Sequence, residues 1–505
     1  MDFHSAMTNR FLCLSVAGVL YVLVLCYYQK NRIFPSTGLT SPPPPIAATK
    51  PACSSMFMIT APSGIINTNS FLSSEDLRRA PHLIAPRLSG FQHSPHIANV
   101  TVQKIVKNRQ SFGIISSDYE SLARLLPRLL FSGNASKLEE EITRQIVKDG
   151  KETSQYQKNI KIKNPPPFLL GRSRIEAAGG VLPYVPCLIA SYSNPTNFYT
   201  CAKKRLQNGS PLWMYFMGDS KIRDLFDEFL TLTEPACNYT VSYWKLNYPW
   251  PAVRKNLFFL RWTDMEATTP VLPGMRVTYV FRKFYCMKLS KLNDTQEISQ
   301  LRLWASGSEP PPSLLVIGYS TWMMLWHKNA NKLSTVDFLD GLRQMHSLVM
   351  PLLQKISQQT RVLVLSQSRF RPYSDASLKQ RAALTSANFD WNEATALHFL
   401  RHGAEVNLYA DTPQSTPLQE NLNPVSSHSS VWWWDSGLPL NLAAHQECEE
   451  LHRLRLTHHP VYRDSFLSCC DPHHAGSVAN RDLVVMLLNL VCNSVLQLDH
   501  RHCCS

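Results

Sequence analysis

Two short stretches of the sequence hold residue types that together can activate a nucleophile. Ser220 ends a Gly-Asp-Ser tripeptide, which follows an apolar run and precedes a pattern typical of an amphipathic helix. Asp471 and His474 lie three residues apart in "CCDPHHAGS". A serine hydroxyl is a weak nucleophile until a base takes its proton, and a third group, usually a carboxylate, orients that base. The residue types predict Ser220 as the nucleophile, His474 as the base and Asp471 as the group that orients it.

Both stretches have alternative explanations. Asp and Ser are favoured at helix N-termini and Gly permits a sharp turn, so the tripeptide that ends in Ser220 also suits a capped helix. His473 is an alternative base because it is adjacent to His474. Cys469 and Cys470, together with the two histidines, are an alternative metal site. They lack the regular spacing of zinc ligands, so we predict no metal site.

Strand-like and helical patterns alternate from about residue 170 onward. Strands are expected at 212–218, 275–285, 313–320, 360–368 and 405–411, and helices at 334–357, 389–403 and 481–498. This alternation is typical of an α/β fold with a parallel sheet and helices on both faces. Active sites in such sheets lie at the carboxyl ends of strands, where Ser220 is expected.

The N-terminal region contains a candidate membrane anchor. Residues 11–28 hold no charged side chain, and as a helix they would span roughly 27 Å, close to the thickness of a bilayer core. The polar sequence "QKNR" follows instead of a small-residue cleavage site, which favours an uncleaved anchor over a signal peptide. We predict a cytoplasmic tail (1–10), a transmembrane anchor (11–28), a proline-rich stem (29–60), an N-terminal luminal segment of uncertain fold (61–168) and a catalytic domain (169–505).

The segment 61–168 has mixed patterns. Residues 73–90 and 118–133 resemble short helices, whereas 99–108, "NVTVQKIVKN", resembles a strand. The sequence "KNPPPF" at 163–168 interrupts any periodicity, so we place the main domain boundary there.

Cysteines and glycosylation sequons favour an oxidising compartment. Five asparagines begin an N-x-S/T sequon: Asn99, Asn134, Asn208, Asn238 and Asn293. Of the 13 cysteines, 11 follow the predicted anchor, an odd number that leaves one thiol free or intermolecular. Cys187 with Cys201, Cys237 with Cys286, and a C-terminal cluster are placed in a way that suits disulfides, although the connectivity stays open. We predict a single-pass type II protein of the secretory pathway.

The formal net charge of the chain is +14. In a lumen, nucleic acid is not an expected partner, so we predict an anionic glycan or nucleotide sugar. Arg369 and Arg371 follow a predicted strand and are candidates for contact with such an anion. The alternative is that these charges are solvated at the surface.

Four sequence blocks resemble the SGNH/PC-esterase superfamily, most closely the luminal catalytic domain of sialate O-acetyltransferases. "FMGDSKIRDLF" resembles the family's GDS block, and "DPHHAGSVANRDLVVMLLNLVCN" resembles its D-x-x-H block and closing helix. Between them, "LLVIGYSTWMM" resembles a strand followed by Gly-x-x-x-Trp, and "VLVLSQS" with "NFDWNEATALHF" resembles a later strand and helix. The blocks keep the family's order over about residues 215–495 and do not cover 29–165. The resemblance implies an SGNH-hydrolase-like fold, with helices flanking a parallel sheet.

The resemblance also implies the roles of the reacting residues. It assigns Ser220 as the nucleophile, Asp471 as the orienting acid, and His474 rather than His473 as the base. Pro472 stands where the family usually has Gly, a departure that removes no reacting group.

Further site residues are implied in the same way. The backbone N–H groups of Ser220 and Gly318 would form an oxyanion hole. Arg223 would be structural or face the substrate, and Trp322 would belong to the core or to a wall of the site. Lys221 replaces an Arg of the family.

The implied reaction transfers an acetyl group from acetyl-CoA, as a co-substrate, to a sugar hydroxyl such as one on sialic acid. The implied location is the Golgi membrane, with the C-terminal domain in the lumen and no bound cofactor. Relatives continue into a region of many membrane spans, whereas this sequence stops at Ser505, so a membrane partner or luminal acetyl-CoA would supply the acyl group. The alternatives are a carbohydrate O-acetyl esterase and a non-catalytic glycan-binding protein of the secretory pathway.

Overall fold

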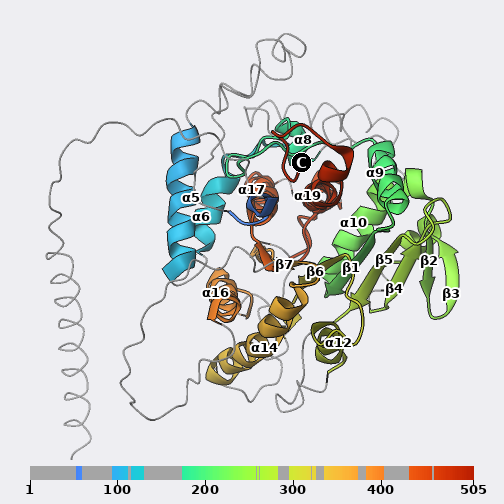
Figure 1. Cartoon of the computed structure of the whole chain (residues 1–505). Coiled ribbons are helices and arrows are strands. Elements are labelled where there is room, and N and C mark those ends of the chain that lie inside the picture. Colours follow the sequence, from blue (N-terminus) through green and yellow to red (C-terminus); the bar gives the residue numbers. More distant parts are fainter. Residues whose placement is uncertain are drawn as a thin grey trace, which may run out of the picture. The chain divides into compact units, whose positions relative to one another are not determined.

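A mixed sheet with the strand order β3-β2-β4-β5-β1-β6-β7-β8 lies at the centre of the computed structural model (Figure 1). The strands are β1 (Trp213–Gly218), β2 (Thr240–Tyr243), β3 (Leu246–Pro249), β4 (Met265–Thr268), β5 (Arg276–Phe281), β6 (Leu314–Gly318), β7 (Arg361–Leu365) and β8 (Val431–Trp434). From β5 through β1, β6 and β7 to β8 the strands are parallel, whereas β4, β2 and β3 pair antiparallel. The predicted parallel sheet is therefore confirmed for five strands and wrong for three.

The structure describes residues 53–59, 94–111, 115–129, 173–282, 295–325, 335–373, 383–402 and 431–505, apart from the single positions 258, 261, 320, 323, 456, 458, 459 and 464. The predicted anchor, most of the predicted stem and the predicted strand at 405–411 lie outside the described residues. The sequons at Asn134 and Asn293 also lie outside them. The described residues all belong to one compact unit.

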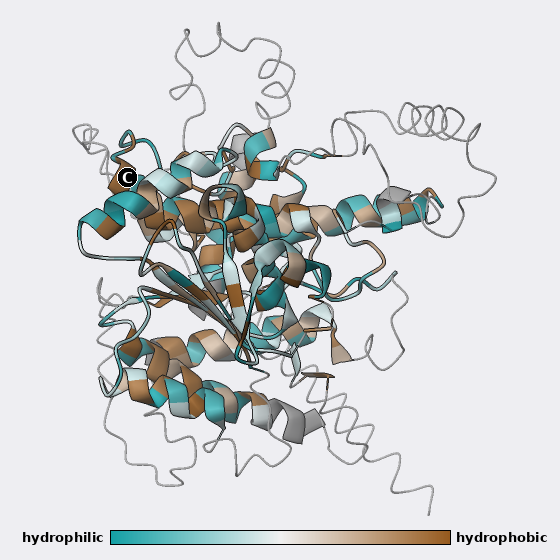
Figure 2. Cartoon of the chain, turned by 90° about the vertical axis from the view of Figure 1, so that its right-hand side faces the viewer, coloured by the Kyte–Doolittle hydropathy of each residue, from teal (hydrophilic) through white to brown (hydrophobic). Residues whose placement is uncertain are grey.

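Helices cover both faces of the sheet (Figures 1 and 2). One face carries α9 (Pro195–Gln207), α10 (Ser220–Cys237), α17 (Leu438–Arg453) and α19 (Ser477–Leu496), and the other carries α12 (Gln296–Ala305), α14 (Thr335–Ile356) and α16 (Ser386–His402). The remaining elements are η1 (Cys53–Met56), α5 (Ser94–Ser111), α6 (Ser116–Ala123), α8 (Arg174–Ala177), α11 (Trp250–Lys255) and α18 (Pro460–Arg463). The predicted α/β class and the predicted helices at 334–357, 389–403 and 481–498 are confirmed.

The strands beneath the candidate nucleophile are buried along almost their whole length. β6 is buried at every position and β1 at every position but the first, as expected for parallel strands that helices cover on both sides. Helix α10 packs an apolar stripe into this core, namely Ile222, Leu225, Phe226, Phe229 and Leu230. Because the stripe fixes the rotation of α10, the opposite face, which begins at Ser220, is left for chemistry.

The predicted strand at residues 99–108 is wrong, because this segment lies within α5. Ala98, Val102 and Ile105 are buried while Val100 is 51% exposed, a helical spacing rather than the alternation of a strand. Side chains of α5 and α6 join the same hydrophobic core as the sheet and its helices. One core therefore contains residues from both sides of position 168.

The described residues form four disulfides, three of which link cysteines that are far apart in the sequence. The disulfides are Cys53–Cys504, Cys187–Cys503, Cys201–Cys492 and Cys448–Cys469. The predicted pairing of Cys187 with Cys201 is wrong, since each bonds to a cysteine near the C-terminus instead. Cys237 is a buried thiol, and Cys286 lies outside the described residues. Four disulfides fit a secreted or luminal protein.

Helix α19 is long and apolar enough to cross a membrane, and within the described residues it is the one helix of that kind. However, 78% of its apolar window is buried inside the protein. It packs against α9, α10 and α17, as a core helix does.

Candidate active site

Two glycines let α10 begin directly above the ends of β1 and β6. Gly218 and Gly318 are register partners on these strands. A Cβ on Gly218 would lie 2.2 Å from the carbonyl oxygen of Gly318, and a Cβ on Gly318 would lie 2.7 Å from Cδ1 of Ile222. This close approach requires glycine at position 218, because the contact there is with backbone, whereas a side chain at position 318 would displace the end of the Ile222 side chain. The approach puts Ser220, the first residue of α10, at the carboxyl end of the sheet.

The side chains of Asp219 and Lys221 fix the first turn of α10. Asp219 Oδ1 accepts a hydrogen bond from the backbone N–H of Lys221 at 3.0 Å. Burial raises the pKa of the Asp219 carboxyl, and the nearby Lys221 ammonium opposes that rise. Lys221 Nζ donates to Thr321 Oγ1 at 3.2 Å and to Gln367 Oε1 at 3.3 Å. The residue after the candidate nucleophile is thus tied to the loops that follow β6 and β7.

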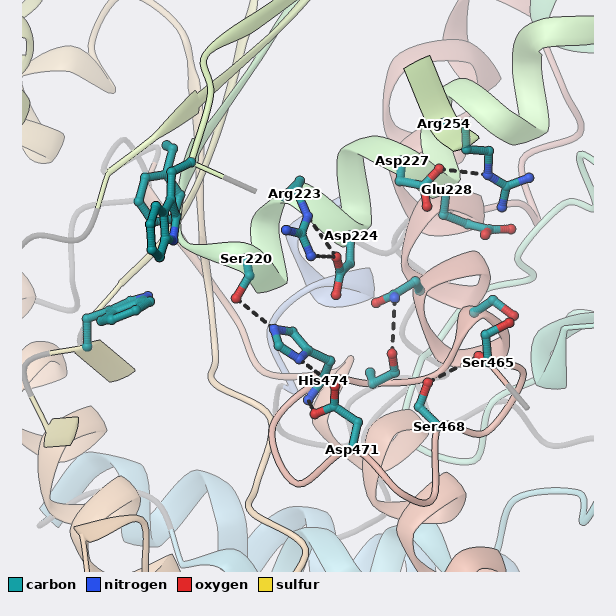
Figure 3. A pocket seen from close by; sticks show the side chains of 16 residues that line it. Ser220, Arg223, Asp224, Asp227, Glu228, Arg254, Ser465, Ser468, Asp471 and His474 are labelled. Carbon is teal, nitrogen blue, oxygen red and sulfur yellow. Dashed lines mark hydrogen bonds and ion pairs between the residues drawn. The ribbon is translucent and has the colours of Figure 1, made fainter. Parts of the chain in front are cut away.

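Ser220, His474 and Asp471 form a hydrogen-bonded chain (Figure 3). His474 Nε2 lies 2.6 Å from Ser220 Oγ, and His474 Nδ1 lies 2.9 Å from Asp471 Oδ2. Asp471 Oδ1 also accepts the backbone N–H groups of His473 at 2.8 Å and His474 at 2.9 Å. With a proton on Nδ1, the imidazole of His474 presents Nε2 as an acceptor for the serine hydroxyl.

The loop that carries Asp471 and His474 is held from several directions. The Cys448–Cys469 disulfide joins it to α17. Gly476 precedes α19, and a Cβ there would lie 2.0 Å from the carbonyl oxygen of Phe466, so this position requires glycine. Together these constraints fix where the loop enters α19 and therefore where its imidazole points.

The electrostatics of the pair favour a charged acid beside a basic imidazole. Burial opposes ionisation of Asp471, but the hydrogen bond from His474, its charge and two backbone N–H groups outweigh this effect and hold the pKa well below its usual range. Burial also lowers the pKa of His474, but the carboxylates of Asp224 and Asp471 more than compensate, so the pKa is raised overall. A raised pKa makes His474 a stronger proton acceptor.

The neighbouring His473 is a poorer candidate for the base. Burial, reinforced by the charges of Lys221 and His474, lowers its pKa to about 4. Its ring packs at 5.5 Å from that of Phe370, and its buried Nε2 has no hydrogen-bond partner among the described residues. The geometry favours His474.

A cavity of about 430 Å³ opens beside Ser220 and His474 (Figure 3), a volume typical of small-molecule sites. Its walls are one face of α10 with α11 (Ser220, Arg223, Asp224, Asp227, Glu228 and Arg254), the loop before α19 with the start of that helix (Ser465, Ser468, Asp471, His474, Ala475, Ser477 and Asn480), and three aromatic side chains (Trp262, Phe281 and Trp322). The cavity therefore combines charged, hydroxyl and aromatic surfaces around the candidate nucleophile.

The other sequence-predicted site residues have different surroundings. Arg223 lines the cavity and pairs with Asp224 at 2.8 Å. Trp322 both lines the cavity and packs on the hydrophobic core, with its ring 6.4 Å from that of Phe281. Gly318 lies beneath the turn and is not among the residues that line the cavity.

Arg369 and Arg371 are buried rather than solvated or open to a ligand. Arg369 pairs with Asp390 at 3.0 Å and with Glu393 at 3.1 Å. The backbone N–H of Arg371 donates to Pro472 O at 3.1 Å, which supports the loop that carries the imidazole. For these arginines, the predicted exposure to an anionic ligand and the alternative of solvation at the surface are both wrong. Other parts of the protein cover the end of β7, after which the two arginines lie.

Asp224 and Asp227 also line the cavity and are not among the site residues predicted from the sequence, although a signal for them exists. They lie four and seven residues after Ser220, and helical periodicity puts these positions on one face. Trp262 precedes β4 in a stretch without a clear period, and no comparable signal points to it.

Among the predicted glycosylation sites, Asn208 and Asn238 are exposed and Asn99 is partly exposed. Asn99 Oδ1 accepts a hydrogen bond from Gln103 Nε2 at 3.2 Å. These positions are open to modification as far as the structure describes them.

In the described part of the chain, no group of three or more His, Cys, Asp or Glu side chains is arranged to hold a metal ion. Cys469, which with Cys470 and the adjacent histidines is an alternative metal ligand, is bonded to Cys448. The chain matches no protein-family model, no curated protein and no solved structure. What defines the site is an α/β fold with a Ser–His–Asp chain at the carboxyl end of a parallel strand.

Proposed function

We propose that this protein is an acyl-transfer enzyme of the SGNH/PC-esterase type, which moves an acetyl group from acetyl-CoA to a sugar hydroxyl. The observation that supports this proposal is the pair of hydrogen bonds Ser220 Oγ–His474 Nε2 (2.6 Å) and His474 Nδ1–Asp471 Oδ2 (2.9 Å) beside a ligand-sized cavity. Such a chain of serine, histidine and carboxylate recurs on unrelated folds and is recognised by its geometry.

The reaction has two acyl transfers. Ser220 Oγ attacks the thioester carbonyl as its proton passes to His474 Nε2. The C–S bond then breaks, and the sulfur of CoA leaves with that proton. In the second step, His474 takes the proton of the acceptor hydroxyl, whose oxygen attacks the acetyl-serine carbonyl. The ester bond to Ser220 breaks, and His474 returns the proton to Ser220 Oγ.

Negative charge develops on the carbonyl oxygen in both steps. The backbone N–H of Ser220 lies at the N-terminus of α10, where unpaired N–H groups and the helix dipole favour an anion. We assign this N–H as one oxyanion donor. The backbone N–H of Gly318, implied by the family resemblance, is the proposed second donor.

A carbohydrate O-acetyl esterase is the second candidate, with water as the acceptor of the same acetyl-serine. The side chains of Asp471 and His474 are 41% and 26% exposed, so water can reach the reacting groups. Transfer and hydrolysis therefore differ in what occupies the cavity when the acetyl-serine is attacked.

The test uses the purified full-length chain and its Ser220→Ala variant. Each is incubated with acetyl-CoA, with and without glycan acceptors, and with O-acetylated glycans, while mass spectrometry follows acetyl groups on the protein and on the sugar. Transferase activity gives acetylated glycan only with wild-type protein, and esterase activity gives deacetylated glycan only with wild-type protein. If the two proteins behave alike in every arm, the non-catalytic glycan-binding alternative replaces this proposal.

The proposed location is the Golgi membrane, through the anchor at 11–28, with the disulfide-linked domain in the lumen. The four disulfides support an oxidising compartment. Removal of N-glycans by an endoglycosidase should increase the electrophoretic mobility of the protein made in cells. Protease treatment of intact microsomes should leave residues after the anchor protected, and digestion of that part would contradict the proposed topology.

A further inference from the structure

The face of α10 beyond Ser220 carries two carboxylates into the same cavity. Asp224 and Asp227 follow Ser220 by four and seven residues, and all three line the cavity. At 1.5 Å per residue, this face extends over roughly 10 Å of helix. Figure 3 shows Asp224 near His474 and Asp227 further along the helix.

Both carboxylates are anchored through one oxygen. Arg223 Nε and Nη2 donate to Asp224 Oδ1 at 3.2 and 2.8 Å. Arg254 Nε and Thr231 Oγ1 donate to Asp227 Oδ1 at 3.0 and 3.2 Å. No hydrogen bond from a described residue ends on Oδ2 of either carboxylate. Each side chain is therefore held in place and keeps one oxygen as an acceptor for a ligand.

The other walls of the cavity suit the remaining groups of a sugar. Ser465, Ser468 and Asn480 supply hydroxyl and amide groups from the loop before α19 and from that helix. Trp262 and Phe281, with the neighbouring Trp322, supply apolar ring surface on the third wall. A sugar ring has hydroxyls around its edge and C–H groups on its faces, so it can hydrogen-bond to the polar walls and pack on the aromatic one.

The charges in the cavity disfavour an anionic ligand. The described lining contains four carboxylates (Asp224, Asp227, Glu228 and Asp471) and two arginines (Arg223 and Arg254), and Arg481, which is not part of the lining, pairs with Glu228 at 2.9 Å. Both lining arginines are already paired with carboxylates of the same cavity. A carboxylate on the sugar would meet like charges and would have to take an arginine from its partner, whereas a hydroxyl donates to Oδ2 without breaking either pair.

We propose that the acceptor is an uncharged sugar unit whose hydroxyls donate to Oδ2 of Asp224 and of Asp227. This inference rests on the proposed function for the location of the site, and it replaces the anionic acceptor expected from the net charge of the whole chain. The two carboxylates then orient one sugar hydroxyl toward Ser220 and His474.

The test measures binding to full-length Ser220→Ala protein, which cannot turn the ligand over. The probes are matched pairs: methyl glycosides of glucose, galactose and mannose, each beside the corresponding uronic acid, and lactose beside sialyllactose. Calorimetry should give at least a tenfold lower Kd for the neutral member of one or more pairs. Tighter binding of the acidic members, equal binding of both members, or binding of none would overturn the inference.

The variant Asp227→Asn, made in the Ser220→Ala protein, sharpens the test. Because it removes the charge and releases Arg254, it should weaken neutral binding and strengthen uronate binding, which narrows or reverses the preference. Glu449→Gln removes a carboxylate from the exposed surface of α17 and is the matched control, with the preference unchanged. An unchanged preference in Asp227→Asn, in a variant with a normal melting temperature, would assign selectivity to another part of the cavity and overturn the inference.

Separate measurements on wild-type protein distinguish failure of this inference from failure of the proposed function. Labelling of Ser220 by a fluorophosphonate and acetyl transfer or release report on the nucleophile and not on the sugar preference. If both reactions fail while the Ser220→Ala protein prefers neutral sugars, the proposed function falls and the sugar site stands. If both reactions succeed while acidic sugars bind better, the function stands and this inference falls.

Discussion

The parallel and antiparallel parts of the sheet contribute differently to the candidate site. β1 and β6 are buried almost throughout, and the turn after β1 carries Ser220. β3, at the antiparallel edge, is exposed at every position. The aromatic wall of the cavity draws on both parts, since Trp262 precedes the antiparallel strand β4, whereas Phe281 ends β5 and Trp322 follows β6, both of which are parallel strands. The parallel part therefore fixes the reacting atoms, and the antiparallel part contributes Trp262 to the surface that a ligand would contact.

The largest effect is expected at the nucleophile on the parallel side. Ser220→Ala should lower kcat by roughly 10³-fold or more, because it removes the hydroxyl that the proposed mechanism acylates. The loss should occur without a change in melting temperature, since Ser220 is only partly buried. Steady-state kinetics and calorimetry measure the two quantities. Residual activity near that of wild type would show that the Ser–His–Asp chain does not carry the reaction.

The second prediction concerns steric crowding between the parallel strands β1 and β6. Gly218→Ala would bring a Cβ to 2.2 Å from the carbonyl oxygen of Gly318, so β1 and β6 must separate at the site. We expect destabilisation of about 2 kcal/mol, in the range typical of overpacked cores, together with loss of activity. Denaturant unfolding measures the stability. Gly209→Ala is the control: its φ is also positive, but no atom lies within 4 Å of the added Cβ. Equal destabilisation of both variants would point to backbone conformation rather than to crowding.

The pH dependence of activity tests whether Asp224, on α10, raises the pKa of His474. His474 must be neutral to accept the serine proton, and its pKa is raised above the usual value. Activity should therefore be present above that pKa and lost as the pH falls through it, at a higher pH than for an ordinary histidine. Asp224→Asn removes a carboxylate that raises this pKa, so the acidic limb of kcat/KM should move to lower pH. If the acidic limb of kcat/KM does not move, Asp224 does not raise the pKa of His474.

A smaller and different effect is expected at the aromatic wall. Trp262→Ala should raise KM for the sugar by about tenfold while kcat stays within about threefold, because the ring lines the cavity and would contact the proposed sugar rather than the reacting atoms. Trp244, 69% exposed beside β2 and absent from the cavity lining, provides the matched comparison. Trp244→Ala should leave KM unchanged and shift stability by no more than about 0.5 kcal/mol. If Trp262→Ala lowers kcat instead of raising KM, the division of labour between the two sides is wrong.

The sequence predicts the buried half of this protein better than the exposed half, for physical reasons. Long apolar strands and amphipathic helices carry periodic patterns, so β1, β6, β7, α14 and α19 are predictable. β2, β3 and β4 have four residues each, too few for a period to be distinguished from chance. The strand-like valines of α5 mislead because burial there follows helical spacing.

Within the candidate site, the reacting residues can be predicted from the sequence, whereas the cavity walls cannot. Ser220, Asp471 and His474 are predictable because few residue types can serve as nucleophile, base and orienting acid, and because they stand at ends of elements. The cavity walls depend on which distant segments fold together, which one sequence does not specify. The disulfide partners of Cys187 and Cys201 are unpredictable for the same reason.

The disulfide connectivity constrains how the protein can be made. Three of the four bridges join cysteines at 53, 187 and 201 to cysteines at 504, 503 and 492. During synthesis, Cys53, Cys187 and Cys201 must therefore remain thiols, or form temporary disulfides, until more than 290 further residues have been synthesised. Because Cys503 and Cys504 are adjacent, each could pair with the wrong one of Cys53 and Cys187. Thiol–disulfide exchange can correct such a mispairing. Biogenesis of this protein should therefore depend strongly on disulfide isomerase activity. A chain stalled before residue 492 would lack these three bridges, whereas Cys448 and Cys469 could already pair.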